Sequence, residues 1–402
     1  MTSFRIKYKT LSVAYYAFCM LLLTLYQVLE MRMMEHGVEP LPGSGMVTCF
    51  VLVVFAGSFL KFYLIPGYKA YMPTKVMIFY LVYWMWIFIP IVFNRLPDSG
   101  MDQVIIFVRQ MIPAFTLLLT YNFLLNHGDS KWFGWYFCGT ALLYALQYFL
   151  IMRELFPWIA HMMVSYYVLY MLPLVMLTSG KKRKVFFIVF TLLVLITSIK
   201  RGGLMAMAGG LVTYGVVYLF ASQKIKAKVV ISAAVVLSIL VGVFFYMASA
   251  LDTGGENIVE RFESVEDDEG SGRLVTWIKT YELIEDSDIG LLILGHGYNA
   301  VEKDSQLGWS AHNDFLEVTY DYGLIGLVLY SVAVISFGWY VLGHIRRKTK
   351  YALDLSMFFA IYMMLSMASH VIIYPWACVI MLTISYISGR EKYEAIHEQN
   401  NI

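Results

Sequence analysis

The sequence of 402 residues is 59% hydrophobic and 14% charged, and its formal net charge is +2 at pH 7. Soluble domains carry roughly 25% charged residues, so this composition excludes an ordinary water-soluble protein and indicates an integral membrane protein. No extended basic patch with interleaved aromatic residues lies outside the apolar runs, so nucleic acid is not expected as a partner.

Apolar runs along the chain predict an all-α, polytopic membrane protein with about 12 transmembrane helices. A membrane-spanning helix needs roughly 20 apolar residues. No small-residue cleavage site follows the first run, which therefore indicates a first span and no cleaved signal peptide. The division of region 352–388 into two spans stays open. The expected spans are residues 10–29, 46–64, 75–93, 103–121, 132–152, 159–178, 185–198, 203–221, 229–250, 313–342, 352–369 and 374–388.

The basic residues predict how these spans are oriented. If both termini lie inside, 20 of the 30 Lys and Arg residues fall in cytoplasmic segments and 9 in outer loops. The remaining one, Arg109, lies within a span. Cytoplasmic loops are enriched in Lys and Arg, so we expect a multi-pass protein of the bacterial inner membrane with both termini in the cytoplasm.

One long loop, at 251–311, divides the chain into spans one to nine (1–250), the loop itself, and the last three spans with a cytoplasmic tail (312–402). The loop carries 14 acidic and 4 basic residues and lies outside by this topology. Residues 273–284 have a helical period and predict an amphipathic helix that lies on the membrane surface. The residues expected to share its apolar face are Leu274, Trp277, Ile278, Tyr281 and Ile284.

Two adjacent cations, Lys200 and Arg201, are predicted on a tight hairpin at the outer membrane boundary. Gly202, Ala206 and Gly210 follow with the spacing of small residues that lets helices pack closely. Snorkelling anchors at a span end are the alternative explanation. Cations are depleted on the outer side, however, which favours a functional role.

A third cation, Arg273, opens the amphipathic helix. A positive charge at a helix start opposes the helix dipole, so its partner is expected elsewhere. Pairing with a nearby carboxylate such as Glu269 is the alternative.

Ala311-His312-Asn313-Asp314 stands directly before a span. Histidine has an unperturbed pKa near 6.5 and serves as a general base in many enzymes. The alternative is an interfacial histidine that caps the helix or pairs with Asp314. Arg109 is a second kind of candidate, because an ionisable group inside the membrane is costly when unpaired and is therefore a functional candidate by default. A structural pair within the bundle is the alternative for Arg109.

No cofactor and no metal are expected. The chain has no phosphate-binding P-loop, no Rossmann glycine pattern, no HExxH motif and no Cys/His metal set. Its four cysteines lie in apolar runs. The acidic run at 266–269 is explained by a solvated loop.

Four short motifs occur in order between residues 185 and 330. They are Ser198-Ile199-Lys200-Arg201-Gly202-Gly203; Ser271-Gly272-Arg273 with Trp277; Leu294-Gly295-His296-Gly297-Tyr298; and Ala311-His312-Asn313-Asp314-Phe315-Leu316, followed by Tyr322-Gly323-Leu324-Ile325-Gly326-Leu327. In order and topology they resemble the O-antigen ligase/polymerase family of membrane glycosyltransferases. Lys200 stands where the resemblance implies a small polar residue.

The resemblance implies a GT-C-like fold and a glycan donor on undecaprenyl diphosphate, presented from the outer leaflet. Arg201 and Arg273, assisted by Lys200, would neutralise the departing diphosphate. His312 would be the general base on the acceptor hydroxyl, with inversion at the anomeric carbon. Arg109, Asn313 and Asp314 would line the site.

The acceptor separates two activities of the same family. A polymerase adds the glycan to another lipid-linked repeat unit, whereas a ligase adds it to lipid A-core or another acceptor. We favour the polymerase. A polysaccharide transporter or flippase is a third alternative, but the informative residues gather on one membrane face, whereas a transport path carries polar groups through the midplane. The sequence leaves open the sugar, the linkage, and whether a partner protein regulates chain length.

Overall fold

The computed structural model describes residues 2–36, 44–64, 67–93, 100–129, 131–155, 164–198, 201–221, 273–372 and 376–399. Throughout these ranges the regular elements are helices. They are α1 (Thr2–His36), α2 (Ser44–Leu64), α3 (Lys75–Phe93), α4 (Gly100–His127), α5 (Lys131–Leu155), α6 (Ser165–Thr178), α7 (Lys181–Thr197), α8 (Arg201–Ala221), α11 (Arg273–Glu285), α12 (Ile289–Leu294), α13 (Ala300–Asp304), α14 (Asp314–Arg346), α15 (Ala352–Ala368) and α16 (Trp376–Gln399).

Every expected span within the described ranges coincides with one of these helices, while the span expected at 229–250 lies outside them. Within those ranges five helices are long and apolar enough to cross a membrane, and α6 and α15 are shorter apolar helices. The all-α, polytopic class is therefore confirmed, and the count of twelve spans stays a prediction. The five long segments are Ser12–Leu29, Lys75–Phe93, Lys131–Glu154, Gly202–Phe220 and Asp314–Arg346.

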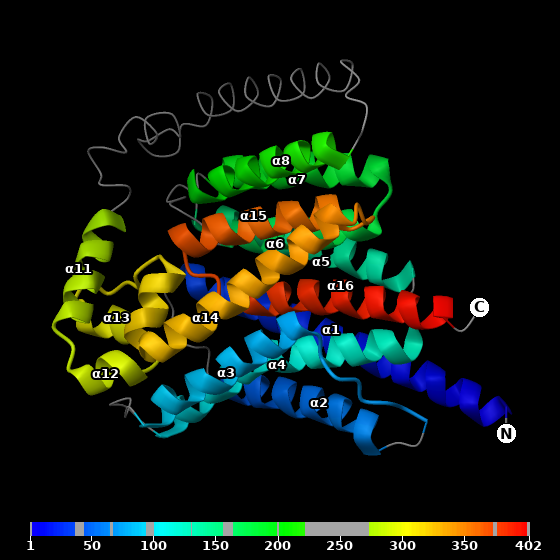
Figure 1. Ribbon diagram of the computed structural model, residues 1–402, viewed down its shortest axis with the longest axis horizontal. Coiled ribbons are helices and arrows are strands. Elements are labelled where there is room, and N and C mark those ends of the chain that lie inside the picture. Colours follow the sequence, from blue (N-terminus) through cyan, green and yellow to red (C-terminus); the bar gives the residue numbers. More distant parts are fainter. Residues whose placement is uncertain are drawn as a thin grey trace.

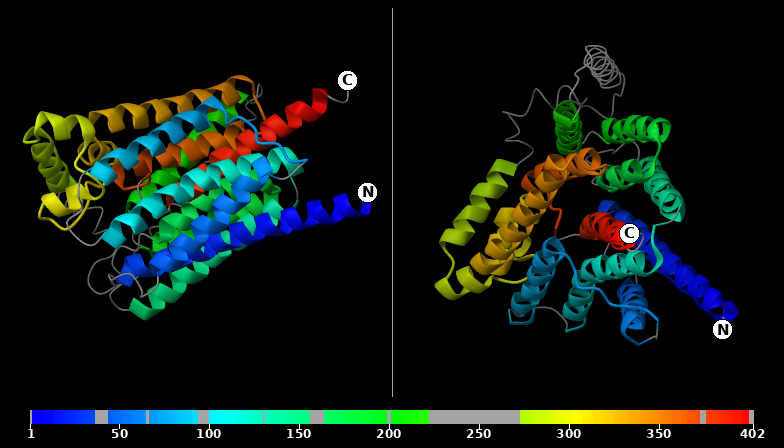
Figure 2. Two further views of the ribbon diagram at one scale, coloured as in Figure 1. Left: turned by 90° about the horizontal axis from the view of Figure 1, so that it is seen from below. Right: turned by 45° about the vertical axis from the view of Figure 1, so that its right-hand side comes forward.

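The helices form one bundle with two distinct ends. Both chain termini lie at one end, and the short helices α11, α12 and α13 gather at the other (Figures 1 and 2). We call these the inner and outer ends, following the orientation predicted from loop charge. Ion pairs join segments that were all expected in the cytoplasm: Lys184–Asp354 at 2.9 Å, Lys350–Glu394 at 2.6 Å and Arg390–Asp129 at 3.1 Å. Segments expected on the cytoplasmic side therefore lie together at one end of the bundle, and the membrane topology stays a prediction.

Small residues on α8 allow close packing against α15, which also packs on α6 and α14. A Cβ atom added at Gly210 would lie 2.7 Å from Ile361 Cγ1, and one at Gly209 would collide with the Met364 side chain. Ala206 is fully buried. The close approach predicted from the spacing of Gly202, Ala206 and Gly210 is thus confirmed.

A kink in α14 holds the short helices at the outer end. Gly323 has φ 73° and ψ 178°, which interrupts the helical backbone one-third of the way along α14. The interruption frees backbone carbonyls, and His296 N donates to Tyr320 O (3.0 Å) while Gly297 N donates to Asp321 O (2.9 Å). A Cβ atom at Gly323 would lie 2.6 Å from Gly295 N. Two of the sequence motifs, around His296 and around Gly323, therefore dock directly on each other.

The amphipathic helix expected at 273–284 is confirmed as α11, which packs on α14. Its buried side carries Thr276 and Thr280, whereas Leu274, Ile278 and Tyr281 are each more than half exposed. Three residues of the expected apolar face are thus turned away from the protein, whereas Trp277 is half-buried and Ile284 packs against the cluster of Ala300, Val301, Ala311 and Tyr320. This placement fits a helix at the membrane surface, which remains a prediction.

Candidate functional site

The guanidinium group of Arg273 lies against the first turn of α8. A Cβ atom added at Gly202 would be 3.4 Å from Arg273 Nη2 and 3.0 Å from Tyr166 Oη. Gly202 directly follows Arg201, the first residue of α8. Two arginines separated by more than 70 positions in the sequence therefore converge on one helix N-terminus, a place that favours bound anions through its free N–H groups. The side chain of Arg201 and all of Lys200 lie outside what the structure describes.

The glycine pair after Arg201 makes this approach possible. Gly202 leaves room for the Arg273 guanidinium and the Tyr166 hydroxyl. Gly203 faces the ring of Tyr166, since a Cβ atom there would lie 2.8 Å from Tyr166 Cε1 and 2.8 Å from Leu195 Cδ2. The first turn of α8 is thus packed between α6, α7 and the start of α11.

The substitution Gly202→Ala should lower activity while the protein still folds. The added methyl group would lie 3.0 Å from Tyr166 Oη, which must give way by a few tenths of an ångström, and would touch Arg273 Nη2 at 3.4 Å, so it crowds the place where the two side chains meet. Misplacing a binding group by about 1 Å can cost 10²-fold in rate, so we expect a loss of about tenfold. Gly215→Ala is the matched control on the same helix, because no atom lies within 4 Å of its added Cβ. Equal transfer rates for the two variants would contradict this role of Gly202.

His312 lies in a constrained loop directly before α14. Its φ is 51°, a left-handed conformation that is uncommon for residues other than glycine. The next residue, Asn313, is the N-cap of α14, and its side chain accepts hydrogen bonds from Phe315 N (3.0 Å) and Leu316 N (3.3 Å). Capping by the histidine itself, one of the alternatives, is therefore wrong, because Asn313 caps the helix.

Asp314 has a structural position at this end of the bundle. It is fully buried, and its carboxylate accepts hydrogen bonds from Tyr330 Oη (3.0 Å), Ser366 Oγ (2.7 Å) and Val371 N (2.8 Å). These bonds fasten the start of α14 to the end of α15 and to the segment after it. The position of His312 thus depends on Asp314, and a direct contact of Asp314 with substrate stays a prediction.

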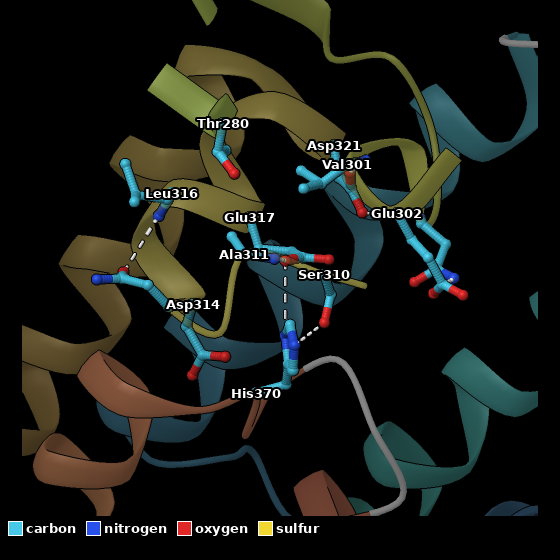
Figure 3. A network of polar contacts seen from close by, with 12 residues as sticks. Thr280, Val301, Glu302, Ser310, Ala311, Asp314, Leu316, Glu317, Asp321 and His370 are labelled. Atoms are coloured by element: carbon cyan, nitrogen blue, oxygen red, sulfur yellow. Dashed lines mark hydrogen bonds and ion pairs between the residues drawn. The ribbon is translucent and has the colours of Figure 1, made fainter. Parts of the chain in front are cut away.

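A buried polar network underlies the His312 loop (Figure 3). Glu317 Oε2 accepts a hydrogen bond from Ala311 N at 2.6 Å and lies 3.5 Å from His370 Nδ1. His370 Nε2 is hydrogen-bonded to Ser310 Oγ. The centroids of the His370 and His312 rings are 4.9 Å apart, with an angle of 47° between the rings.

The packing of α8 on α15 brings the two halves of the site to one level (Figure 1). The helices run antiparallel, with Gly210 opposite Ile361 and Gly209 opposite Met364. Moving back along α8 to Arg201 therefore moves forward along α15 to its last turn. The start of α8 thus lies near the end of α15, and His370, which contacts the ring of His312, follows that end by two residues.

Burial lowers the pKa of His370 well below its usual value, and the nearby charge of His312 lowers it further. His370 is therefore neutral in the folded protein and takes up a proton on unfolding once the pH falls below about 6.5. Between about pH 7.5 and about pH 5.5 this proton uptake should cost the folded state about 1.4 kcal/mol.

The variant His370→Gln should not show this loss of folding stability at low pH, because glutamine takes up no proton. Thermal unfolding in detergent at both pH values measures it, and the comparison between wild type and variant cancels the other titrating groups. Parallel pH dependences for the two proteins would contradict a neutral buried His370.

Arg109, the remaining candidate, is half-buried on α4, between two and three turns from the outer end of that helix. Helix α4 packs against α1, α2, α3 and α16. A role for Arg109 in the site stays a prediction.

Sequence reasoning missed three buried residues: Glu317, His370 and Asp321. Asp321 Oδ2 accepts from Asn299 N (2.8 Å) and Oδ1 from Val301 N (3.2 Å), so its carboxylate caps α13. The available signal was the spacing of Asp314, Glu317 and Asp321, which share one face of a helix. Carboxylates on one face of an apolar span predict a buried polar cluster.

The fold and the site together define a polytopic membrane protein with an arginine-bearing helix start and a loop histidine at the same end of the bundle. Residues 186–331 match the family model described as O-antigen ligase. This stretch therefore carries a domain of the O-antigen ligase family, whose members are membrane enzymes of the ligase/polymerase type, and the resemblance identified from the motifs is confirmed. The match covers Arg201, Arg273 and His312. No curated protein matches the chain significantly.

Proposed function

We propose that the protein is a glycosyltransferase that polymerises oligosaccharide repeat units carried on a polyprenyl diphosphate, at the outer face of the inner membrane. The observation that carries this proposal is the guanidinium of Arg273 against the first turn of α8, beside Arg201. A guanidinium at a helix N-terminus whose first residue is a second arginine suits a diphosphate, because arginine binds phosphate oxygens in a bidentate manner and the helix end favours anions. The family also implies lipid-linked glycan substrates in a membrane.

In the proposed reaction the acceptor hydroxyl oxygen attacks the anomeric carbon of the donor sugar. The bond from that carbon to the diphosphate oxygen breaks, and the bonding electron pair stays on the diphosphate. Arg201 and Arg273, with Lys200, stabilise the negative charge that develops there. The imidazole of His312 takes the proton of the acceptor hydroxyl. Attack opposite the leaving group inverts the anomeric centre.

The choice of acceptor rests on the outer end of the bundle. In the described part of the outer loop, from residue 273 on, the chain forms three short helices packed on α14 or on one another. This compact arrangement favours a second lipid-linked repeat unit, which diffuses in the same leaflet as the donor. We therefore propose that the acceptor is a second lipid-linked repeat unit, as in a polymerase.

Ligation is the second candidate function, and the description of the matching family favours it. Donor binding and bond cleavage are the same for both activities, so the arginines do not distinguish them. Transfer to lipid A-core or another acceptor would need only a different acceptor position near His312.

A deletion strain and the purified protein test the proposal together. Loss of the glycan ladder, with a single repeat still attached to its final acceptor, supports the polymerase. Polymer that accumulates on the polyprenyl lipid supports the ligase and overturns the polymerase. Purified protein in detergent should also turn over synthetic lipid-linked repeat units. No turnover of donor with either acceptor would favour a transporter and overturn glycan transfer.

A further inference from the structure

The polar network under the His312 loop has no part in the reaction as proposed. Glu317, His370 and Ser310 are each at most 5% exposed, although they lie near the outer end of the bundle. Burying polar side chains costs free energy unless they are hydrogen-bonded. Their bonds therefore indicate what the network does.

Two side chains fix the backbone on either side of His312. On one side, Glu317 Oε2 accepts from Ala311 N at 2.6 Å. On the other, Asn313 caps α14 through its own side chain. Between them His312 has a φ of 51°, and such a conformation persists only where the surroundings enforce it. Glu317 is thus one of the groups that hold the loop in this shape.

His370 contacts both the loop and the imidazole ring. Its Nε2 is hydrogen-bonded to Ser310 Oγ, and its Nδ1 lies 3.5 Å from Glu317 Oε2. Its ring lies 4.9 Å from that of His312, centroid to centroid. A buried ring with contacts on three sides restricts the orientations available to His312.

We propose that Glu317 and His370 are positioning residues: Glu317 fixes the backbone before His312, and His370 fixes its ring, so that the imidazole points toward the acceptor hydroxyl. This inference rests on the proposed role of His312 as the base. General bases in other enzymes are oriented in the same way by a third group that does not touch the substrate.

The order Ser310–His370–Glu317 also has the form of a nucleophile, base and acid. A nucleophile must reach the anomeric carbon, however, and Ser310 is only 5% exposed. Ser310→Ala separates the two explanations. A positioning network loses one bond and keeps activity within about tenfold of wild type, whereas loss of a nucleophile costs about 10⁴-fold or more. A loss of the larger size would overturn the positioning role.

Two substitutions at Glu317 test the geometry directly. Glu317→Ala removes the acceptor for Ala311 N, and we expect kcat to fall about 100-fold. The KM for the donor should stay within about twofold, because the arginines hold the diphosphate. Glu317→Gln keeps a carbonyl oxygen at the same place and should restore kcat to within about tenfold of wild type. His370→Ala should also lower kcat. Because this variant keeps the hydrogen bond from Ala311 N to Glu317, it tests the network even if Glu317→Ala fails to insert into the membrane.

Tyr320→Phe is the matched control on the same helix. It removes a single contact, Tyr320 Oη to Asp304 Oδ2 at 2.8 Å, one turn from Glu317. We expect its kcat within about twofold of wild type. A purely structural role of the network would lower the amount of folded protein in Glu317→Ala and His370→Ala and leave the kcat of the folded fraction unchanged.

The reactivity of His312 provides a readout that does not depend on transfer activity. Diethyl pyrocarbonate modifies accessible imidazoles, and mass spectrometry of the His312 peptide measures the rate. We expect Glu317→Ala and His370→Ala to change this rate at least about threefold, and Tyr320→Phe to leave it unchanged.

The outcomes separate the two proposals. If wild type transfers glycan and His312→Asn does not, but Glu317→Ala and His370→Ala keep wild-type kcat and His312 reactivity, the positioning role is overturned and the proposed function stands. If His312→Asn transfers glycan normally, the proposed base fails, and the reactivity of His312 still tests whether the network positions the ring.

Discussion

Replacing Arg273 with alanine should reduce glycan transfer about 10²- to 10³-fold, the usual cost of removing one group that stabilises transition-state charge. The guanidinium lies 3.4 Å from the Cβ position of Gly202, beside the first residue of α8. In the proposed reaction the departing diphosphate develops negative charge beside this guanidinium. The rate with synthetic lipid-linked repeat units measures the loss, with the amount of protein in the membrane measured in parallel.

The transfer rate of Arg273→Lys should lie between the rates of the wild type and of Arg273→Ala. Lysine keeps the positive charge but is a point donor, so it loses the bidentate contact to phosphate oxygens. We expect a loss of about tenfold. An equal loss for lysine and alanine would show that the fork of the guanidinium matters more than its charge.

Lys279→Ala is the matched control for Arg273. Lys279 lies on the same helix α11, and its ammonium pairs with Glu282 at 3.0 Å on the exposed side. Exposed pairs of this kind contribute about 0–1 kcal/mol to stability, so neither folding nor transfer should change by more than about twofold. Wild-type transfer by Arg273→Ala, at wild-type membrane levels, would remove Arg273 from the donor site.

The bundle itself was predictable because the bilayer imposes the length and polarity of each span. Apolar runs of about 20 residues identified the helices, although α1 (Thr2–His36) and α16 (Trp376–Gln399) extend well beyond the spans expected at 10–29 and 374–388. The ion pairs Lys184–Asp354 and Lys350–Glu394 join segments that loop charge had placed on the same side of the membrane. Neither the apolar runs nor the loop charge predicts how one helix packs on another.

The convergence of Arg201 and Arg273 was predicted by resemblance to a family and not by physical pattern. Each arginine alone had a structural explanation, and only the order of the motifs joined them. The structure adds the physical reason: glycines at 202 and 203 let α6 and α11 approach the same turn of α8.

The spacing of the carboxylates on α14 predicts a buried polar cluster, but the contact of Glu317 with His370 was not predictable from local sequence. Glu317 stands in the first turn of α14, where an acidic residue is ordinary because it favours the helix dipole. His370 follows α15 and is more than 50 positions away. Only tertiary structure reveals that both side chains are turned inward to the same loop. The kink at Gly323 was not predicted either, because a single glycine within a membrane span is common.

Replacing His312 with asparagine should abolish measurable transfer, with a loss of about 10²- to 10⁴-fold, the range attributed to a general base. Asparagine is the informative substitution because it tolerates the left-handed conformation that His312 adopts at φ 51°. The loop should therefore keep its shape while the base is lost. Alanine removes the base and also strains the backbone, by about 1–2 kcal/mol.

The pair of variants distinguishes chemistry from loop structure. If His312 acts as the base, asparagine and alanine should be equally inactive although only alanine lowers the thermal stability. His397→Asn, at an exposed histidine in the last turn of α16 at the inner end, is the control and should transfer glycan at the wild-type rate. Wild-type glycan length and yield with His312→Asn would mean that the acceptor proton leaves by another route, because no imidazole would remain at this position to accept it.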